Sequence, residues 1–407
     1  MGVDEAVAAE LERSADRARS RGGAAAAAAF LARAAELTPD PAERGRRALA
    51  AAQAKFDAAA ADAALDLLAT AELAPLDEFQ RAWLERLRAE ITFARTRGSD
   101  APALLLDAAR RLEPLDAAMA RETHLEAIAA AMFAGRLGDG PGVGEVAEAA
   151  HVAPAAEQPR ALDLLLDGLA TRFIEGYPAS VPPVRRALDE FRDVEGLSER
   201  DVRWLWLGCR LAQDLWDDEL WYVLATRGLR VARETGALSV LPIAATYRAA
   251  LHVHAGEFGA ASELIAEADA ITQATGMAPL KYASLMRAAW RGNEAEALEL
   301  MEAARVEGTA RGEGMGLRVL EWATALLYNG CGRYGEALEA AQRGCEQDDV
   351  GLFGWSLVEL IEAGVRSGAT DASSAALDRL SERILRAKAE EALQLVLEGR
   401  HVRPMTA

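Results

Sequence analysis

The sequence predicts an all-α solenoid, in which helix hairpins stack side by side into a superhelix. Three observations predict this fold. Apolar residues recur at spacings of three and four along nearly the whole chain, runs of alternating β-branched residues are missing, and one short segment recurs. Alanine, leucine, arginine and glutamate dominate the composition, and these residues favour helix.

Start and stop signals divide the chain into short helices. Asp40 offers an N-cap, Pro41 suits the first helical turn, and Glu43 adds an acid at the third helical position. Glycines mark helix ends, as at Gly276 and Gly292. These signals predict many short helices joined by tight turns.

A recurring eight-residue segment indicates how the helices pair. Its copies start at Gly256, Gly292 and Gly332, so the starts lie 36 and 40 residues apart. Each copy has a turn glycine, then a large or long residue, then three residues later a small alanine that lets the neighbouring helix approach closely. The pattern resembles a degenerate tetratricopeptide repeat (TPR). The copies read GEFGAASE at 256–263, GNEAEALE at 292–299 and GRYGEALE at 332–339.

The repeat length predicts the domain organisation. At ~37 residues per unit, the 407 residues would form about 10 or 11 helix pairs. The clearest interruption is GDGPGVG at 138–144, followed by Pro154 and Pro159. An ordinary surface loop inside one continuous solenoid is the alternative interpretation of this interruption. We predict TPR-like repeats at 1–135, a Gly/Pro-rich loop or bend at 136–160, further TPR-like repeats at 161–382 and a divergent tail at 383–407.

The charge balance limits the classes of partner. The chain has 45 Lys+Arg against 64 Asp+Glu, a formal net charge of −19. It lacks the surplus of cations that binds nucleic acid or an anionic membrane, so we expect neither as a direct partner of this chain. The longest run free of charged residues, 235–247, has 13 residues and contains Pro242, which is too short for a membrane-spanning helix.

The N-terminus and the cysteines predict a cytoplasmic protein. The sequence opens with acidic residues and shows no apolar segment of an export signal. The three cysteines, Cys209, Cys331 and Cys345, are widely spaced and odd in number, which favours free thiols in a reducing compartment. Lysine is rare while arginine and alanine are abundant, a composition typical of bacterial coding sequences of high GC content.

Motifs for cofactors, metals and catalysis are missing from the sequence. A phosphate-binding loop needs glycine before its lysine, but the residues before the three lysines are Ala54, Leu280 and Ala387. His252 and His254 lie two residues apart, which places them on different faces of a helix and prevents a shared metal. We therefore predict no catalytic residues, no cofactor and no metal. An enzyme with an unrecognised site is a minor alternative.

The least ordinary local feature is a group of aromatic residues in a chain with only 6% aromatics. These side chains could line a concave groove and stack on a ligand or a partner helix. Alternatively, they fill the volume that small alanines leave between helix pairs, because tryptophan is mostly buried in folded proteins. The predicted ligand-binding or partner-binding residues are Trp204, Trp206, Trp216, Trp221 and Tyr222.

Five longer segments of the sequence resemble a known protein family. They read GAAAAAAFLARAAELTPDPAERGRRALAAAQA at 23–54, RGSDAPALLLDAARRLEPLD at 97–116, RWLWLGCRLAQDLWDDELWYVLATR at 203–227, GALSVLPIA at 236–244 and WATALLYNGCGRYGEALEAAQ at 322–342. Together they closely resemble the helical-repeat arm of large ATP-binding LuxR-type (MalT-like, STAND/AAA) transcriptional regulators. The resemblance covers about residues 5–382.

The resemblance implies the role of a regulatory arm. In that family an ATPase domain precedes the arm and a LuxR-type helix-turn-helix follows it. The motifs of both domains are missing here, and we therefore expect a truncated or independently evolved reading frame. The arm of such regulators is a sensor that binds a protein or a small-molecule inducer and controls self-association.

We therefore predict a non-enzymatic sensor or protein-interaction scaffold. It would bind a protein or small ligand on its concave face, along a long preformed groove that offers many weak contacts. Self-association is a further prediction. The alternative is a structural remnant or decoy that co-assembles with full-length regulators without sensing a ligand.

Overall fold

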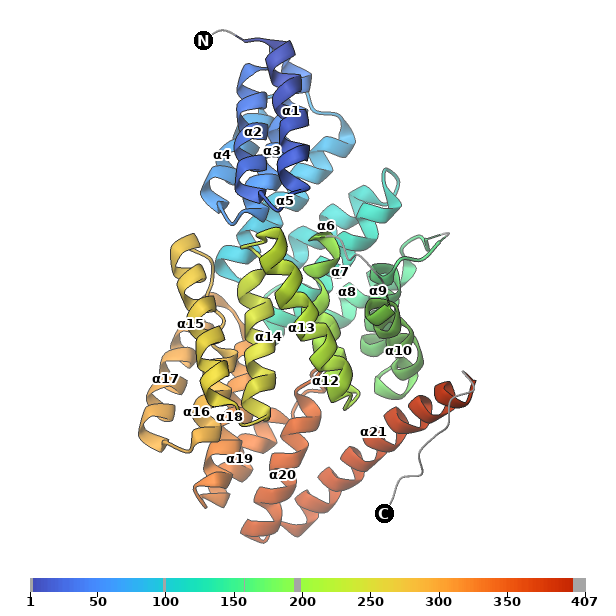
Figure 1. Ribbon diagram of the computed structural model, residues 1–407. Coiled ribbons are helices and arrows are strands. Elements are labelled where there is room, and N and C mark those ends of the chain that lie inside the picture. Colours follow the sequence, from blue (N-terminus) through green and yellow to red (C-terminus); the bar gives the residue numbers. More distant parts are fainter. Residues whose placement is uncertain (1–2, 98–99, 157, 194–198, 398–407) are drawn as a thin grey trace.

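The computed structural model describes residues 3–97, 100–156, 158–193 and 199–397, which form 21 α-helices and a single 3-10 helix, and no strand occurs within these ranges. Consecutive helices pack against each other as hairpins and wind into a superhelix (Figure 1). The predicted all-α solenoid of hairpins is therefore confirmed. Among the described helices, none is both long and apolar enough to span a lipid bilayer.

The helices have the following bounds. The N-terminal half contains α1 (Glu5–Arg19), α2 (Ala24–Leu37), α3 (Pro41–Asp57), α4 (Ala61–Glu72), α5 (Glu78–Thr96), α6 (Ala101–Leu112), α7 (Ala117–Ala134), η1 (Gly135–Leu137), α8 (Val143–Val152), α9 (Ala161–Ile174) and α10 (Tyr177–Asp193). The C-terminal half contains α11 (Glu199–Val202), α12 (Leu205–Asp214), α13 (Asp218–Thr235), α14 (Leu241–His254), α15 (Phe258–Thr275), α16 (Tyr282–Arg291), α17 (Glu294–Arg311), α18 (Gly314–Gly330), α19 (Tyr334–Gly344), α20 (Phe353–Ser367) and α21 (Thr370–Leu397).

The recurring glycines occupy equivalent turns in three hairpins. Gly256, Gly292 and Gly332 have φ values of 74°, 68° and 75°, in the left-handed region where glycine is favoured, and each lies two residues before α15, α17 or α19. The repeat alanines Ala261, Ala297 and Ala337 are each 0% exposed, as expected of small residues that let a neighbouring helix approach closely. Both features agree with the repeat that the sequence predicts.

Residues 136–160, predicted as a Gly/Pro-rich loop or bend, contain helix α8. The loop prediction is therefore wrong for residues 143–152. The cause is a short apolar stripe: Val146, Ala147 and Ala150 are buried in the hydrophobic core that also includes residues before and after this segment. The glycines and prolines only delimit this helix. In the tail predicted at 383–407, residues 383–397 continue α21, and residues 398–407 lie outside the described residues.

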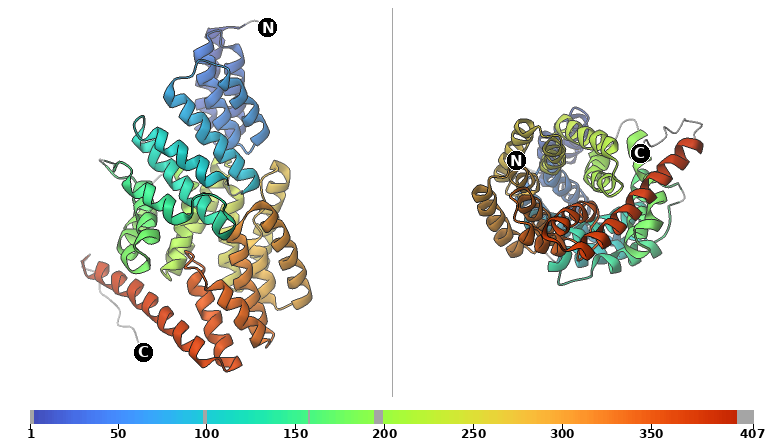
Figure 2. Two further views of the ribbon diagram at one scale, coloured as in Figure 1. Left: turned by 180° about the vertical axis from the view of Figure 1, so that it is seen from behind. Right: turned by 90° about the horizontal axis from the view of Figure 1, so that it is seen from below.

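Segments far apart in sequence meet across the inside of the superhelix. Helices α7 and α18 lie side by side, and a Cβ placed on Gly314 would lie 2.3 Å from the carbonyl oxygen of Ala134. The backbone N–H of Ala278 donates to the carbonyl of Ala94 at 3.2 Å. Seen end-on, the helices surround a common axis (Figure 2). These contacts join helices of the N-terminal half to helices of the C-terminal half.

A buried ion network fixes α21 to the middle of the superhelix. Asp214 in α12 pairs with Arg172 in α9 at 3.0 Å and with Arg383 in α21 at 2.7 Å. Asp348 completes the network, at 2.6 Å from Arg172 and 2.9 Å from Arg383. Burial alone would raise the pKa of Asp214, but the two guanidinium groups outweigh it and lower this pKa. The C-terminal helix is thus held by charge as well as by apolar packing.

Candidate functional site

A cavity of about 690 Å³ lies inside the superhelix. Residues of α1, α3, α5, α6 and α7 form one side of it, and residues of α12, α14, α15 and the segments between them form the other. Its volume is typical of pockets that hold drug-sized ligands. Ala94 and Ala278, which are joined by a backbone hydrogen bond, both line the cavity.

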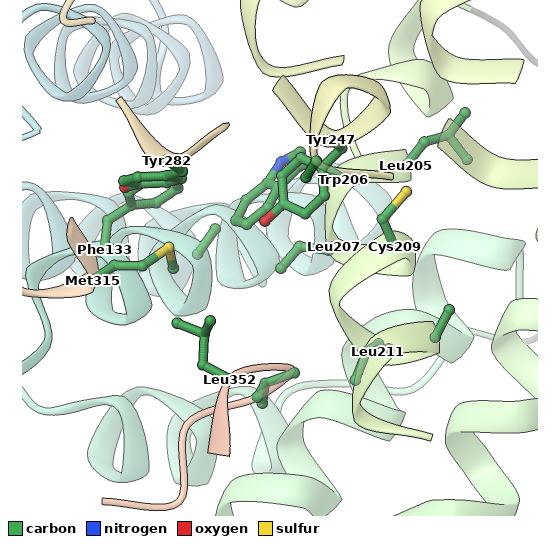
Figure 3. Close-up of a cluster of buried hydrophobic side chains, with 14 of the residues drawn as sticks. Phe133, Leu205, Trp206, Leu207, Cys209, Leu211, Tyr247, Tyr282, Met315 and Leu352 are labelled. Carbon is green, nitrogen blue, oxygen red and sulfur yellow. The ribbon is translucent and has the colours of Figure 1, made fainter. Parts of the chain in front are cut away.

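Aromatic side chains form an apolar wall of the cavity. The ring of Phe133 in α7 lies 5.3 Å from that of Phe93 in α5 and 5.2 Å from that of Trp206 in α12, measured between ring centroids. Tyr247 packs behind Trp206 at 6.2 Å, and Figure 3 shows Phe133, Trp206 and Tyr247 in this order across the buried cluster. Such rings offer flat apolar surface for stacking at little cost in side-chain entropy.

A group of five buried charges forms the polar wall, and we call it the axial ion cluster. It consists of Arg86 and Glu90 in α5, Glu122 and Glu126 in α7, and Arg203 before α12. Arg86 lies 2.5 Å from Glu126, 2.9 Å from Glu90 and 3.5 Å from Glu122. Arg203 lies 3.1 Å from Glu90 and 3.3 Å from Glu126. The cluster joins three elements, and Arg203 lies more than a hundred residues after Arg86 in the sequence.

Three carboxylates facing two guanidinium groups leave one negative charge uncompensated. Burial raises the pKa of Glu126 to about 8, the charge of Glu90 adds to this effect, and Arg86 and Arg203 oppose it. Burial would also raise the pKa of Glu90, but Arg203 and Arg86 lower it below its ordinary value. At neutral pH, Glu126 therefore retains a proton, and the axial ion cluster has no net charge.

This proton makes stability depend on pH. The pKa of Glu126 is about 8 in the folded protein and 4.5 ordinarily, so the folded state binds the extra proton between these two pH values. Since the unfolded state binds fewer protons there, Glu126 makes the free energy of unfolding fall as the pH rises from about 4.5 to about 8. Glu126→Gln cannot ionise, and we expect it to gain stability relative to wild type across this range. Urea unfolding of both proteins at pH 5, 6, 7 and 8 measures the difference, and a difference independent of pH would contradict the assignment.

The structure brings together two of the five aromatic residues that the sequence singled out. Trp204 and Trp206 line the cavity, 3% and 8% exposed respectively. Trp216 instead packs beside Gly354 in a separate core cluster, and Tyr222 is 49% exposed beneath the guanidinium of Arg248. Because successive helical residues point in different directions, neighbours in sequence reach different faces.

Trp221 belongs to a second aromatic group, which surrounds the exposed ring of His254. The ring of His254 lies 5.5 Å from Trp221, 6.0 Å from Trp290, 6.0 Å from Trp322 and 4.5 Å from Trp355, measured between centroids. His254 is exposed at the surface, but the indoles around it partly desolvate its imidazole and lower its pKa below the ordinary value. These rings pack mainly against one another, as the volume-filling interpretation of the tryptophans expects.

Sequence reasoning missed the axial ion cluster. Acidic and basic residues are frequent throughout the chain, so pairs spaced by four carry little information. One signal was present: Glu122 and Glu126 lie in α7, where most of the other residues are alanine or another apolar residue. Charges spaced by four within such a helix indicate a buried polar group rather than a solvated face. Among the described residues, no cluster of histidine, cysteine, aspartate or glutamate could hold a metal ion.

Comparisons with known proteins place the fold but not the family. No protein-family model matches the sequence, and no curated protein matches it. The chain is similar to the solved structure named "Crystal Structure of Rap Protein Complexed with Competence and Sporulation Factor", with a TM-score of 0.51, 14% sequence identity, and coverage of 86% of this chain and 100% of that chain. A "Circular tandem repeat protein with novel repeat topology and enhanced subunit contact surfaces" matches at 14% identity over 97% of this chain and 92% of that chain, but its TM-score of 0.14 carries no argument. The chain therefore has a TPR-like helical-repeat fold.

Proposed function

We propose that this chain is a non-enzymatic sensor or interaction scaffold that binds a short peptide or a small organic ligand in the interior cavity. One observation carries the proposal: the superhelix encloses about 690 Å³ between an aromatic wall and a charged wall. Apolar pockets with a few convergent polar groups are the usual form of ligand sites in proteins.

The electrostatics of the cavity favour binding over catalysis. The carboxylates of the axial ion cluster already bind Arg86 and Arg203 at 2.5 to 3.9 Å. A general acid or base must be free to exchange its proton with a substrate, whereas these groups are held by their partners. The cluster is suited to fixing the shape of the cavity.

The Rap protein structure is consistent with a binding role, since that protein was crystallised with competence and sporulation factor. The finer assignment, to the regulatory arm of LuxR-type regulators, depends on the sequence resemblance alone. Under that assignment, occupancy of the cavity would control self-association of the arm. Light scattering with and without a cavity ligand measures this effect.

A variant that fills the cavity tests the proposal. Ala129 in α7 lines the cavity and is 5% exposed, so the ring of Ala129→Phe would occupy ligand space. We expect a thermal-shift screen of metabolites and short peptides to yield ligands that stabilise wild type, by about 2.7 kcal/mol at a hundredfold excess over Kd. Their effect should be lost in Ala129→Phe.

The control makes the same substitution on an exposed helix face. Ala29 in α2 is exposed and does not line the cavity, so Ala29→Phe should respond to every ligand as wild type does. Ligands that stabilise Ala129→Phe as strongly as wild type would bind elsewhere and would contradict the proposal. A screen without any cavity-dependent ligand would also count against it.

A further inference from the structure

Two of the charged side chains that line the cavity have no ion-pair partner among the described residues. Nine charged side chains line the cavity. Five belong to the axial ion cluster, which is neutral when Glu126 holds its proton. Arg19 lies 4.0 Å from Asp16 at the edge of the cavity. The remaining two are one carboxylate, Asp57, and one guanidinium, Arg97.

Asp57, the last residue of α3, makes no ion pair with any described residue. Its carboxylate accepts one hydrogen bond, from the side-chain amide of Gln53 at 3.0 Å. Burial raises the pKa of Asp57, and the negative charge of Glu90 adds to this effect while Arg203 opposes it. A partly desolvated carboxylate with a single neutral donor gains most from a cation brought by a ligand.

Arg97, the C-cap residue that follows α5, is a buried cation without a carboxylate at ion-pair distance among the described residues. It is 8% exposed, and its guanidinium lies 4.8 Å from the ring centroid of Phe133 and 5.3 Å from that of Phe93. Its Nε–H has no hydrogen-bond partner. The nearby carboxylate of Glu313 already accepts from Tyr282 and from Arg311. Rings stabilise a cation but do not satisfy its N–H donors, so Arg97 retains capacity for an anion.

The two unpaired charges face different neighbours. Arg203, Glu90 and Arg19 act electrostatically on Asp57, whereas Glu313 and Arg311 act on Arg97. The rings of Phe93 and Phe133 belong to the Arg97 end of the cavity. A ligand that satisfies both groups must therefore carry opposite charges at separate positions, with an apolar part beside the rings.

We propose that the cavity takes a zwitterionic ligand with an apolar body, whose ammonium group pairs with Asp57 and whose carboxylate pairs with Arg97. This inference rests on the proposed function, since it names the ligand class of the same cavity. A free amino acid and a short peptide with free ends share this chemistry. They differ in the distance between their charges.

Chemically matched ligands test the proposal. The probes are phenylalanine and a tripeptide library with phenylalanine fixed in the middle, in free, N-acetylated and C-amidated forms, titrated into the full chain by calorimetry. We expect the free forms to bind, and removal of either charge to weaken binding by about tenfold, as loss of one charge-assisted pair predicts. Phenylalanine binding more tightly than the library identifies the amino-acid source, and the reverse order identifies the peptide source.

Variants assign each ligand charge to its protein partner. In Asp57→Asn, N-acetylation of the ligand should no longer weaken binding, whereas C-amidation should still weaken it. In Arg97→Gln, C-amidation should no longer weaken binding, whereas N-acetylation should still weaken it. Arg97→Lys keeps the positive charge, so C-amidation of the ligand should still weaken its binding to this variant. Circular dichroism verifies that each variant folds. In Asp62→Asn and Arg95→Gln, which alter an exposed pair outside the cavity, both modifications of the ligand should weaken binding as in wild type.

The outcomes separate this inference from the proposed function. If the free, N-acetylated and C-amidated ligands bound equally well, and Ala129→Phe bound none of them, the zwitterion inference would be overturned. The cavity would remain the binding site. The zwitterion inference would also be overturned if N-acetylation and C-amidation weakened binding to Asp57→Asn and Arg97→Gln as much as to wild type. A library without any binder would overturn it as well. Binding that survives in Ala129→Phe would overturn the proposed function itself.

Discussion

Replacing Arg86 by methionine is expected to lower the free energy of unfolding by about 3–5 kcal/mol, because it leaves three buried carboxylates with Arg203 as their one remaining cation in the cluster. Arg86 is 5% exposed and binds Glu90, Glu122 and Glu126, each of which is at most 6% exposed. Methionine retains the apolar stem of arginine, so the loss reports the charge rather than the packing. Equilibrium unfolding in urea at pH 7 measures the change.

A second arginine of the same helix provides the control. Arg88 binds Glu72 at 2.8 Å, but their side chains are 43% and 57% exposed. Water screens this pair, so Arg88→Met should change the free energy of unfolding by about 0–1 kcal/mol. Similar effects of the two substitutions would show that the axial ion cluster is not important for stability.

Replacing Gly314 by alanine is expected to lower the free energy of unfolding by about 1–3 kcal/mol through overpacking. The added Cβ would lie 2.3 Å from the carbonyl oxygen of Ala134 and 3.0 Å from the backbone nitrogen of Arg136. Both neighbours are backbone atoms, which cannot rotate away, so α18 must separate from α7. Thermal unfolding measures the loss, and limited proteolysis reports whether the superhelix opens.

Gly330, at the other end of α18, offers the matched control. A Cβ at this position would meet no heavy atom within 4 Å, and its φ is not positive. Gly330→Ala should therefore leave stability unchanged or raise it by up to about 1 kcal/mol, since alanine restricts the unfolded chain. If Gly314→Ala behaved like this control, α7 and α18 would not be in close contact at this position.

The two substitutions act on contacts of α7, a helix that lines the cavity. Arg86 holds α5 to α7 and, through the shared carboxylates, to Arg203 before α12. Gly314 allows α18 to approach α7 across the interior. Since both are long-range contacts, we expect ligand affinity and global stability to fall together in Arg86→Met and Gly314→Ala. In Ala129→Phe, by contrast, affinity should fall without a comparable loss of fold.

Local sequence features were enough to predict the hairpins. The glycines at 256, 292 and 332 require left-handed backbone, and the alanine five residues after each glycine must be small because another helix packs on it. These constraints act within one repeat of about 37 residues, so a single sequence displays them. Helix α8 was missed because the glycines and prolines that flank it are turn signals too, and only its burial against distant residues stabilises so short a helix.

The candidate site depended on contacts that no local pattern displays. Trp204 and Trp206 were predicted as binding residues and line the cavity, yet Trp216, Trp221 and Tyr222 point to other surroundings. No pattern in the sequence indicates that Asp57 and Arg97 could bind a ligand. Their significance arises because every other charge around the cavity has a partner, and pairing is a property of three-dimensional neighbours.

By itself, the sequence determined that this chain is a stack of helix hairpins with a surplus of acidic residues. Repeat spacing and helix propensity act over a few turns, so they can be read along the chain. Only the tertiary structure decided how far the superhelix closes, which charges are left unpaired and where a ligand could enter. Those outcomes follow from the small rotation between successive hairpins, which accumulates over the stack and brings α18 against α7 and α21 against α10.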